Sequence, residues 1–169
     1  MKNTIKVFVL VALTLAAMSV SAQVKLGHIE TQKLIQAMPE WTAAQKTFEE
    51  EQKKVNTDLN SLREQFQTKL AEYSEKMKTY SEAMRATTEE ELQGLQQRIQ
   101  RFQETAMAQL EKTQNDVMQP VREKALNAIK EVGKENGFTY IFDMNAGILY
   151  AAENSQDVLP LVKKKLGLQ

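Results

Sequence analysis

The sequence predicts a mainly helical protein with a small β body, in which a long antiparallel helical hairpin is inserted into a small α/β oligomerisation module. Residues 40–119 predict the hairpin, because they contain no proline, a single glycine and many Glu, Gln, Lys, Leu, Ala and Met residues, which favour helix. Residues 23–39 and 120–169 predict the module, because they hold all three prolines, five of the six glycines and the β-branched and aromatic runs. The hairpin is therefore an arm that interrupts a body made from both ends of the chain.

Residues 1–22 have the pattern of a secretory signal peptide. Lys2 and Lys6 precede the apolar run 7–17, and Val20-Ser21-Ala22 supplies a small-residue cleavage site. The apolar run is shorter than the span of about 20 residues that a transmembrane helix needs, so an uncleaved anchor is the weaker alternative. We expect export from the cytoplasm and a mature chain that begins at residue 23.

The first part of the predicted body is short. Residues 24–30 read as a strand, and Thr31 can cap a short helix over residues 32–37. Pro39 suits the first turn of the next helix, where its missing N–H has no intrahelical partner to lose. The chain is therefore expected to leave the body and enter the arm near residue 40.

Two apolar stripes predict two helices of equal length in the arm. Each stripe takes eight steps over 29 residues, about 3.6 residues a step, which is the period of a straight α-helix. The stripes can therefore pack against each other along their whole length. Their members are Val55, Leu59, Leu62, Phe66, Leu70, Tyr73, Met77, Tyr80 and Met84 in the first, and Leu92, Leu95, Ile99, Phe102, Ala106, Leu110, Thr113, Val117 and Val121 in the second.

A turn is expected between the stripes, near residues 86–89. Thr87 with Glu90 and Thr88 with Glu91 form two overlapping capping boxes, which mark helix N-termini. Residue numbers of facing positions would then add up to about 176, so that Met84 faces Leu92 and Val55 faces Val121. The alternative is one continuous helix about 140 Å long.

The second part of the body begins at Pro120, which should loosen or bend the second helix and is our candidate for the arm hinge. Asn136-Gly137 is a helix stop signal. Residues 138–143 and 148–152 read as strands joined by a turn over 145–147, and Ser155 with Asp157 opens a final helix. Such a small body buries little apolar surface and leaves strand edges free, which favours a homo-oligomer.

The composition argues against an enzyme. The chain has no cysteine and one histidine, which excludes disulfides, thiol catalysis and multi-histidine metal centres. It also lacks a phosphate-binding glycine-rich loop and a nucleophile motif. We therefore expect no catalytic residue, no cofactor and no bound metal. The balance of 22 basic and 22 acidic residues gives no indication of nucleic-acid binding.

Both ends of the mature chain resemble the Skp/OmpH family of periplasmic chaperones. The segments that carry the resemblance are 24–34, 120–143 with its Gly137-Phe138-Thr139-Tyr140-Ile141-Phe142-Asp143 run, and 147–151. The resemblance implies a homotrimer in which strands of three subunits form a central body and three helical arms surround a cavity. It further implies that unfolded outer-membrane proteins are held in that cavity, in the periplasm and without ATP.

The arm departs from that family in its charge. Well-known members are strongly basic, whereas residues 40–119 carry 11 basic and 15 acidic side chains here. Contact with membrane surfaces is therefore expected to be weak, and client capture should depend more on short-range apolar contact. The candidate client-binding residues are Met77, Tyr80, Met84, Met107 and Met118, chosen because methionine and tyrosine suit adaptable surfaces.

Two alternatives stay open at this point. Met77 and Met84 lie on the apolar stripe, so packing between the two helices would also explain them. The whole chain could instead be a structural or adaptor coiled-coil hairpin protein of the cell envelope, which would hold one fixed partner rather than many unfolded ones.

Overall fold

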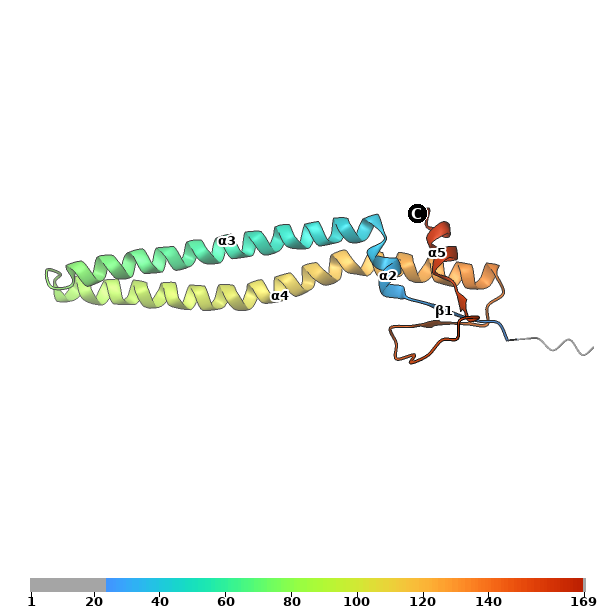
Figure 1. The fold of residues 1–169 in the computed structure, drawn as a ribbon. Coiled ribbons are helices and arrows are strands. Elements are labelled where there is room, and N and C mark those ends of the chain that lie inside the picture. The colour runs from blue at the N-terminus through green and yellow to red at the C-terminus, as the bar shows by residue number, and fades with distance from the viewer. Residues whose placement is uncertain (1–23, 169) are drawn as a thin grey trace, which may run out of the picture.

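The computed structural model describes residues 24–168, so the predicted signal peptide lies outside the described residues. Helix α3 (Pro39–Lys76) and helix α4 (Glu82–Glu135) lie side by side as a long antiparallel arm, with a small body at one end (Figure 1). The body contains a three-stranded sheet and two short helices. The predicted fold class, a helical hairpin inserted in a small α/β module, is confirmed.

The sheet is parallel and built around the first strand. Strand β1 (Leu26–Ile29) lies between β2 (Tyr140–Asp143) and β3 (Gln156–Asp157). Gly27 pairs with Ile141 on one side and with Gln156 on the other. The connection from β1 to β2 runs through the whole arm, so the sheet brings together segments that are more than 100 residues apart in the sequence.

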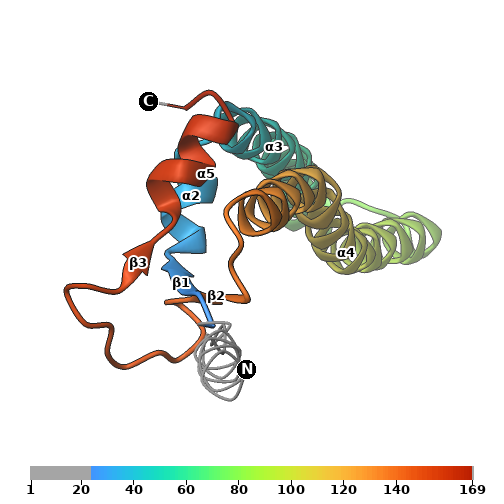
Figure 2. The same ribbon diagram turned by 90° about the vertical axis from the view of Figure 1, so that its right-hand side faces the viewer.

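The core of the body forms where the sheet packs on α4. The short helices α2 (Thr31–Gln36) and α5 (Leu159–Lys165) lie next to each other beside α4 (Figure 2). The C-terminal third of α4 therefore packs against α2, α5 and β2. The core residues are Ile29, Leu34, Met38, Ala44, Met118, Val121, Ala125, Ala128, Val132, Val158 and Val162.

Local signals explain how these elements begin and end. Helix α4 stops where Gly137 takes the left-handed conformation (φ 68°) and the N–H of Phe138 donates to the carbonyl of Gly133 at 2.9 Å. Helix α5 begins where the Asp157 carboxylate accepts from the N–H of Leu159 at 2.9 Å. The Thr31 side chain does not cap α2, contrary to expectation. The Asp143 carboxylate, from β2, instead accepts from the N–H of Thr31 at 3.3 Å.

The turn of the arm differs from the prediction near residues 86–89. Helix α3 ends at Lys76 and α4 begins at Glu82, where the Ser81 hydroxyl accepts from the N–H of Met84 at 3.3 Å. The hydroxyls of Thr87 and Thr88 donate to carbonyls four residues earlier, inside α4. Because a threonine hydroxyl can be satisfied within a helix in this way, the two capping boxes do not force a helix start.

The predicted register of the arm is also wrong, because the turn lies earlier in the chain than predicted. Lys69 pairs with Glu91 at 2.5 Å, Tyr73 donates to Glu89, and Lys124 pairs with Glu40. The residue numbers of these facing pairs add up to 160–164 rather than 176. Val55 consequently lies opposite a part of α4 well before Val121, and Met84 lies in the first turn of α4.

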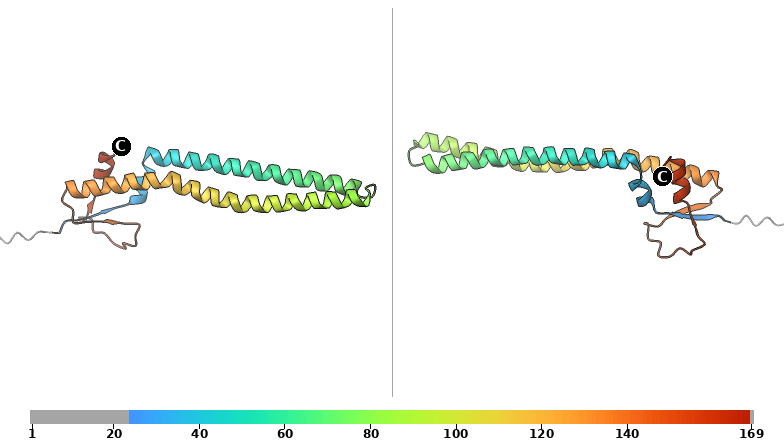
Figure 3. Two further views of the ribbon diagram at one scale, coloured as in Figure 1. Left: turned by 180° about the vertical axis from the view of Figure 1, so that it is seen from behind. Right: turned by 45° about the horizontal axis from the view of Figure 1, so that its top comes forward.

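The earlier turn also makes the two helices unequal. Helix α3 has 38 residues and α4 has 54, so α4 is about 80 Å long at 1.5 Å per residue. Figure 3 shows α4 continuing past the start of α3 into the body. Among the helices of residues 24–168, none has the length and apolar character to cross a membrane.

The predicted strand over residues 148–152 is absent from this single copy. A loop connects β2 to β3, and its turn at Asn145 is held by the Asp143 carboxylate, which accepts from the N–H of Asn145 at 3.0 Å. The third strand lies later, at Gln156–Asp157. Leu149 and Tyr150 are 99% and 80% exposed, and the run pairs with no strand of the described chain.

Candidate client-binding arm and body face

The seam between α3 and α4 is narrow. In the arm away from its root, only Thr88, Leu92 and Ala106 are buried. The other seam positions, such as Val55, Leu62 and Ile99, are half-buried, and the remaining helix surface is exposed. Each helix therefore packs one narrow face against its neighbour and leaves most of its surface open to solvent or to a bound partner.

Polar contacts between the two helices lie near the ends of the arm. Lys69–Glu91 and Tyr73–Glu89 lie near the turn, and Glu40–Lys124 lies at the root. Glu91 raises the pKa of Lys69, and Lys124 lowers the pKa of Glu40, in both cases mainly through a hydrogen bond between the two side chains. These pairs are solvent-exposed and add little stability, but they fix the register. Between them, apolar contact alone holds the helices together.

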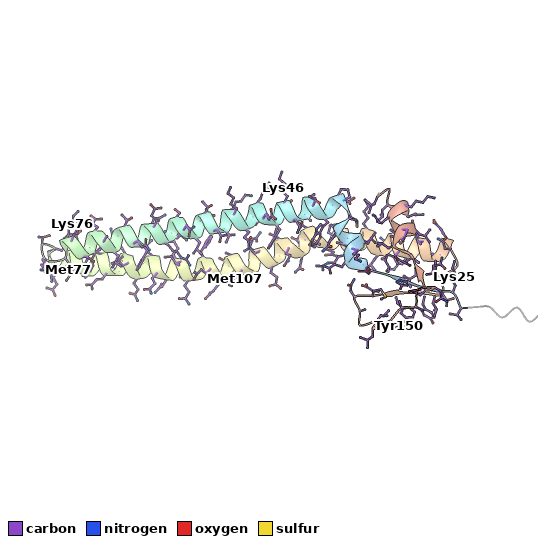
Figure 4. All side chains as sticks on the ribbon, viewed as in Figure 1. Lys25, Lys46, Lys76, Met77, Met107 and Tyr150 are labelled. Atoms are coloured by element: carbon purple, nitrogen blue, oxygen red, sulfur yellow. The ribbon has the colours of Figure 1, made fainter. Side chains whose placement is uncertain are left out.

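Three of the five predicted client-binding residues are exposed on the arm. Met77, at the end of α3, is 42% exposed, and Met84, in the first turn of α4, is 52% exposed. Met107 is 75% exposed on the outer side of α4 (Figure 4). Packing between the helices therefore leaves part of each of these three side chains free for contact.

The other two predicted client-binding residues are placed differently. Tyr80 is half-buried at the turn, with its ring centroid 6.4 Å from that of Tyr73. Met118 is only 8% exposed and belongs to the core at the root of the arm, so it is not available as a contact surface. Leu70 is exposed near the turn and was not among the predicted residues. Its position on the apolar stripe indicated packing between the helices, so nothing in the sequence indicated its exposure.

Pro120 lies inside α4, close to the root of the arm. It has no N–H to donate to the carbonyl of Asp116, so one bond of the helical ladder is missing there. The neighbouring residues Met118 and Val121 are buried in the core, and α4 remains helical on both sides. The missing bond lies where the arm leaves the body.

The body has an uncovered apolar face. Leu26, Tyr140 and Phe142 alternate outward along β1 and β2 and are exposed, while Gly27 and Ile29 face the core. The rings of Tyr140 and Phe142 stack with centroids 6.1 Å apart. No helix of the described chain covers this side of the sheet, which faces the 144–155 loop (Figure 1).

A cavity of about 240 Å³ lies between this face and the loop. Its lining includes Leu26, Phe142, Ile148 and Tyr150. At its edge the Nδ1 atom of His28 lies 3.0 Å from the Ser155 hydroxyl, which ties the end of the loop to β1. Sequence reasoning predicted association through this module, but it did not predict that the apolar run would lie in a loop.

Within residues 24–168, no group of three or more His, Asp or Glu side chains could hold a metal ion. Exposed large apolar side chains of the described residues include those of the methionine-bearing arm and of the uncovered face of the sheet.

These features define a class of protein, a helical-hairpin arm inserted into a small parallel-sheet body with exposed apolar side chains on both parts. A family model described as "Outer membrane protein (OmpH-like)" matches residues 25–166. The chain therefore belongs to the OmpH-like, or Skp, family of non-enzymatic periplasmic chaperones. No curated protein matches the chain.

Proposed function

We propose that this protein is an ATP-independent holdase that binds unfolded outer-membrane proteins between its arms and prevents their aggregation. The observation that carries the proposal is the exposure of Met77, Met84 and Met107 along an arm that buries only one narrow seam. Membership of the OmpH-like family supports the client class. It would act in the periplasm, after export directed by the signal peptide expected in residues 1–22 and cleavage of that peptide.

Adaptable contact suits this role because unfolded clients share no fixed shape. Methionine is flexible and polarisable, and it can fit many apolar partners. The arm has a net charge of −4 from 11 basic and 15 acidic residues, so it supplies little attraction for anionic surfaces. We therefore place client capture on apolar contact, with membrane contact weak.

The body would join copies of the chain, and the family resemblance supports a homotrimer. The exposed Leu26, Tyr140 and Phe142, together with Leu149 and Tyr150 of the loop, form an apolar surface that another copy could cover. Pro120 would act as the hinge that lets each arm swing against this body. An assembly of this kind would surround a client with several arms at once.

An aggregation assay tests the proposal. A denatured outer-membrane β-barrel protein is diluted from urea with the mature chain at increasing ratios, and light scattering is recorded. We expect suppression at near-stoichiometric ratios for several unrelated β-barrel proteins. The proposal would be overturned if the aggregation of none of these β-barrel proteins were suppressed. Protection of only one of them would favour the adaptor alternative.

Matched variants test whether the exposed methionines of the arm contribute to the suppression of aggregation. The triple variant Met77→Gln, Met84→Gln, Met107→Gln removes apolar contact at exposed positions and should weaken suppression. The control Lys53→Gln, Lys78→Gln, Arg98→Gln changes three exposed cations instead and should retain it. If the control loses suppression and the methionine variant does not, capture depends on charge rather than on the methionines.

A further inference from the structure

Five of the six methionines of the described chain fall into two groups by exposure. Met107, Met84 and Met77 on the arm are 75%, 52% and 42% exposed, whereas Met38 and Met118 in the core are 1% and 8% exposed. The sixth, Met144, is half-buried and lines the cavity beside the 144–155 loop. The chain has no cysteine, so methionine thioethers are its only oxidisable sulfur atoms. An oxidant that reaches the folded protein therefore meets the sulfur atoms of the arm first.

We propose that Met77, Met84 and Met107 are oxidation sites at which peroxides switch off the apolar contact surface of the arm. One oxygen of hydrogen peroxide is transferred to the thioether sulfur, so that the O–O bond breaks and an S–O bond forms. The sulfur loses two electrons, the peroxide is reduced, and water leaves. The product is methionine sulfoxide, which is polar where the thioether was apolar.

The positions of these residues separate an effect on binding from an effect on folding. Because the three side chains are exposed to solvent, a sulfoxide oxygen at each of them can stay hydrated. Met38 and Met118 lie in the core with Leu34 and Val121, where a sulfoxide would be buried without a partner. Their burial protects them, so moderate oxidation should change the arm surface and leave the fold intact.

This inference rests on the proposed function, since the surface that is switched off is the one proposed to hold clients. It also predicts reversibility, because methionine sulfoxide reductases with a dithiol reductant convert sulfoxide back to thioether. The dithiol becomes a disulfide and the sulfoxide oxygen leaves as water. A reversible change would let the protein recover its contact surface after oxidative stress.

The first test maps the sites. The intact mature protein is treated with hydrogen peroxide for increasing times, and sulfoxide at each methionine is quantified by peptide mass spectrometry. We expect Met107 to react fastest, Met84 and Met77 next, and Met38 and Met118 at least about tenfold more slowly. Comparable rates at Met38 or Met118 would overturn the assignment of the arm residues as the selective sites.

The second test measures the consequence. We expect oxidation of the three sites to weaken client binding by about tenfold in apparent Kd, with an unchanged Tm by circular dichroism. Treatment with methionine sulfoxide reductases and dithiothreitol should restore binding. The variant Met77→Leu, Met84→Leu, Met107→Leu keeps apolar side chains that do not oxidise, so it should bind clients equally well before and after peroxide.

The outcomes separate this inference from the proposed function. If the untreated protein binds no unfolded β-barrel protein, both fail. If it binds, but peroxide leaves binding unchanged although the arm methionines are oxidised, only the oxidation switch fails. The oxidation switch also fails if peroxide weakens client binding by the leucine variant as strongly as by the native chain. The effect would then come from other residues.

Discussion

At the scale of single residues, Gly27 shows how closely β1 is fitted into the body. A Cβ atom at this position would lie 2.8 Å from Cε1 of Phe138 and 2.9 Å from Cγ1 of Val158. We therefore expect Gly27→Ala to lower the free energy of unfolding by about 1–3 kcal/mol through overpacking. Urea unfolding followed by circular dichroism measures this change.

Gly94 provides the matched control, because it lies inside α4 and an added Cβ there meets no atom within 4 Å. Gly94→Ala should raise the free energy of unfolding by about 0.5–1 kcal/mol, since alanine is the better helix former. Equal effects at the two glycines would contradict the close contacts assigned to β1.

Asp143 makes stability depend on pH. Burial acts to raise the pKa of its carboxyl, but hydrogen bonds from Asn145 and Thr31 outweigh it and hold the pKa below the ordinary 3.8. A depressed pKa in the folded state means that the stabilisation is present above pH 3.8 and is lost as the pH falls through the folded value. Stability should therefore decrease on acidification below pH 3.8.

The variant Asp143→Asn tests this contribution. Its amide cannot ionise, so we expect a loss of about 1 kcal/mol at pH 7 and a smaller decrease in stability between pH 4 and pH 2 than in the native chain. Urea unfolding at a series of pH values gives both quantities. An unchanged pH profile would mean that other carboxyl groups are responsible.

At the scale of elements, the position of the turn distinguishes Ser81 from Thr87. The Ser81 hydroxyl caps α4, so Ser81→Ala should cost about 1 kcal/mol and increase amide hydrogen exchange over residues 82–85. Thr87 is exposed within α4 and bonds only its own helix, so Thr87→Ala should be neutral or slightly stabilising. The reverse result would support a turn near residues 86–89.

The turn also shows what sequence reasoning could and could not predict. The helical period followed from the apolar stripes, and antiparallel pairing was the favoured interpretation beside one continuous helix. The position of the turn could not be predicted from the sequence, because a threonine hydroxyl such as that of Thr87 or Thr88 can form a hydrogen bond both at a helix cap and inside a helix. Ser81 is the weaker signal in sequence, and the pairing of Lys69 with Glu91 and of Tyr73 with Glu89 is visible only in three dimensions.

Pro120 allows a direct test of the proposed hinge. Pro120→Ala restores an N–H to the helical ladder, and we expect it to raise the free energy of unfolding by about 1–3 kcal/mol. It should also narrow the distribution of distances between spin labels at Lys78→Cys in the turn and Lys164→Cys in the body. An equally broad distribution would place the flexibility elsewhere in the arm.

At the scale of the whole molecule, the proposed oligomer depends on the loop that carries Leu149 and Tyr150. Both side chains are almost fully exposed in one copy, so Leu149→Asp with Tyr150→Asp should leave each copy folded. We expect sedimentation velocity to show a smaller species than the native protein. The control Ala146→Asp with Asn154→Asp adds the same charge to the same loop and should keep the native size.

The body was predicted in outline because its signals are local. Residues 24–30 and 138–143 were predicted as strands, and β1 and β2 lie within them. The run 148–152 has equal strand character, yet a strand needs a partner as well as a sequence. The sites on the arm were partly predictable, because Met77, Met84 and Met107 differ from Met118 only in what surrounds them once α4 enters the core.

The arm is an insertion whose chain enters and leaves at adjacent points of the body, near Glu40 and Lys124. Removing matched stretches from α3 and α4 would therefore draw the turn closer to the body and leave the sheet, α2 and α5 as they are. The length of the arm can therefore change independently of the body. Evolution or engineering could adjust it to the size of the cargo by deletion alone, without redesigning a single core residue.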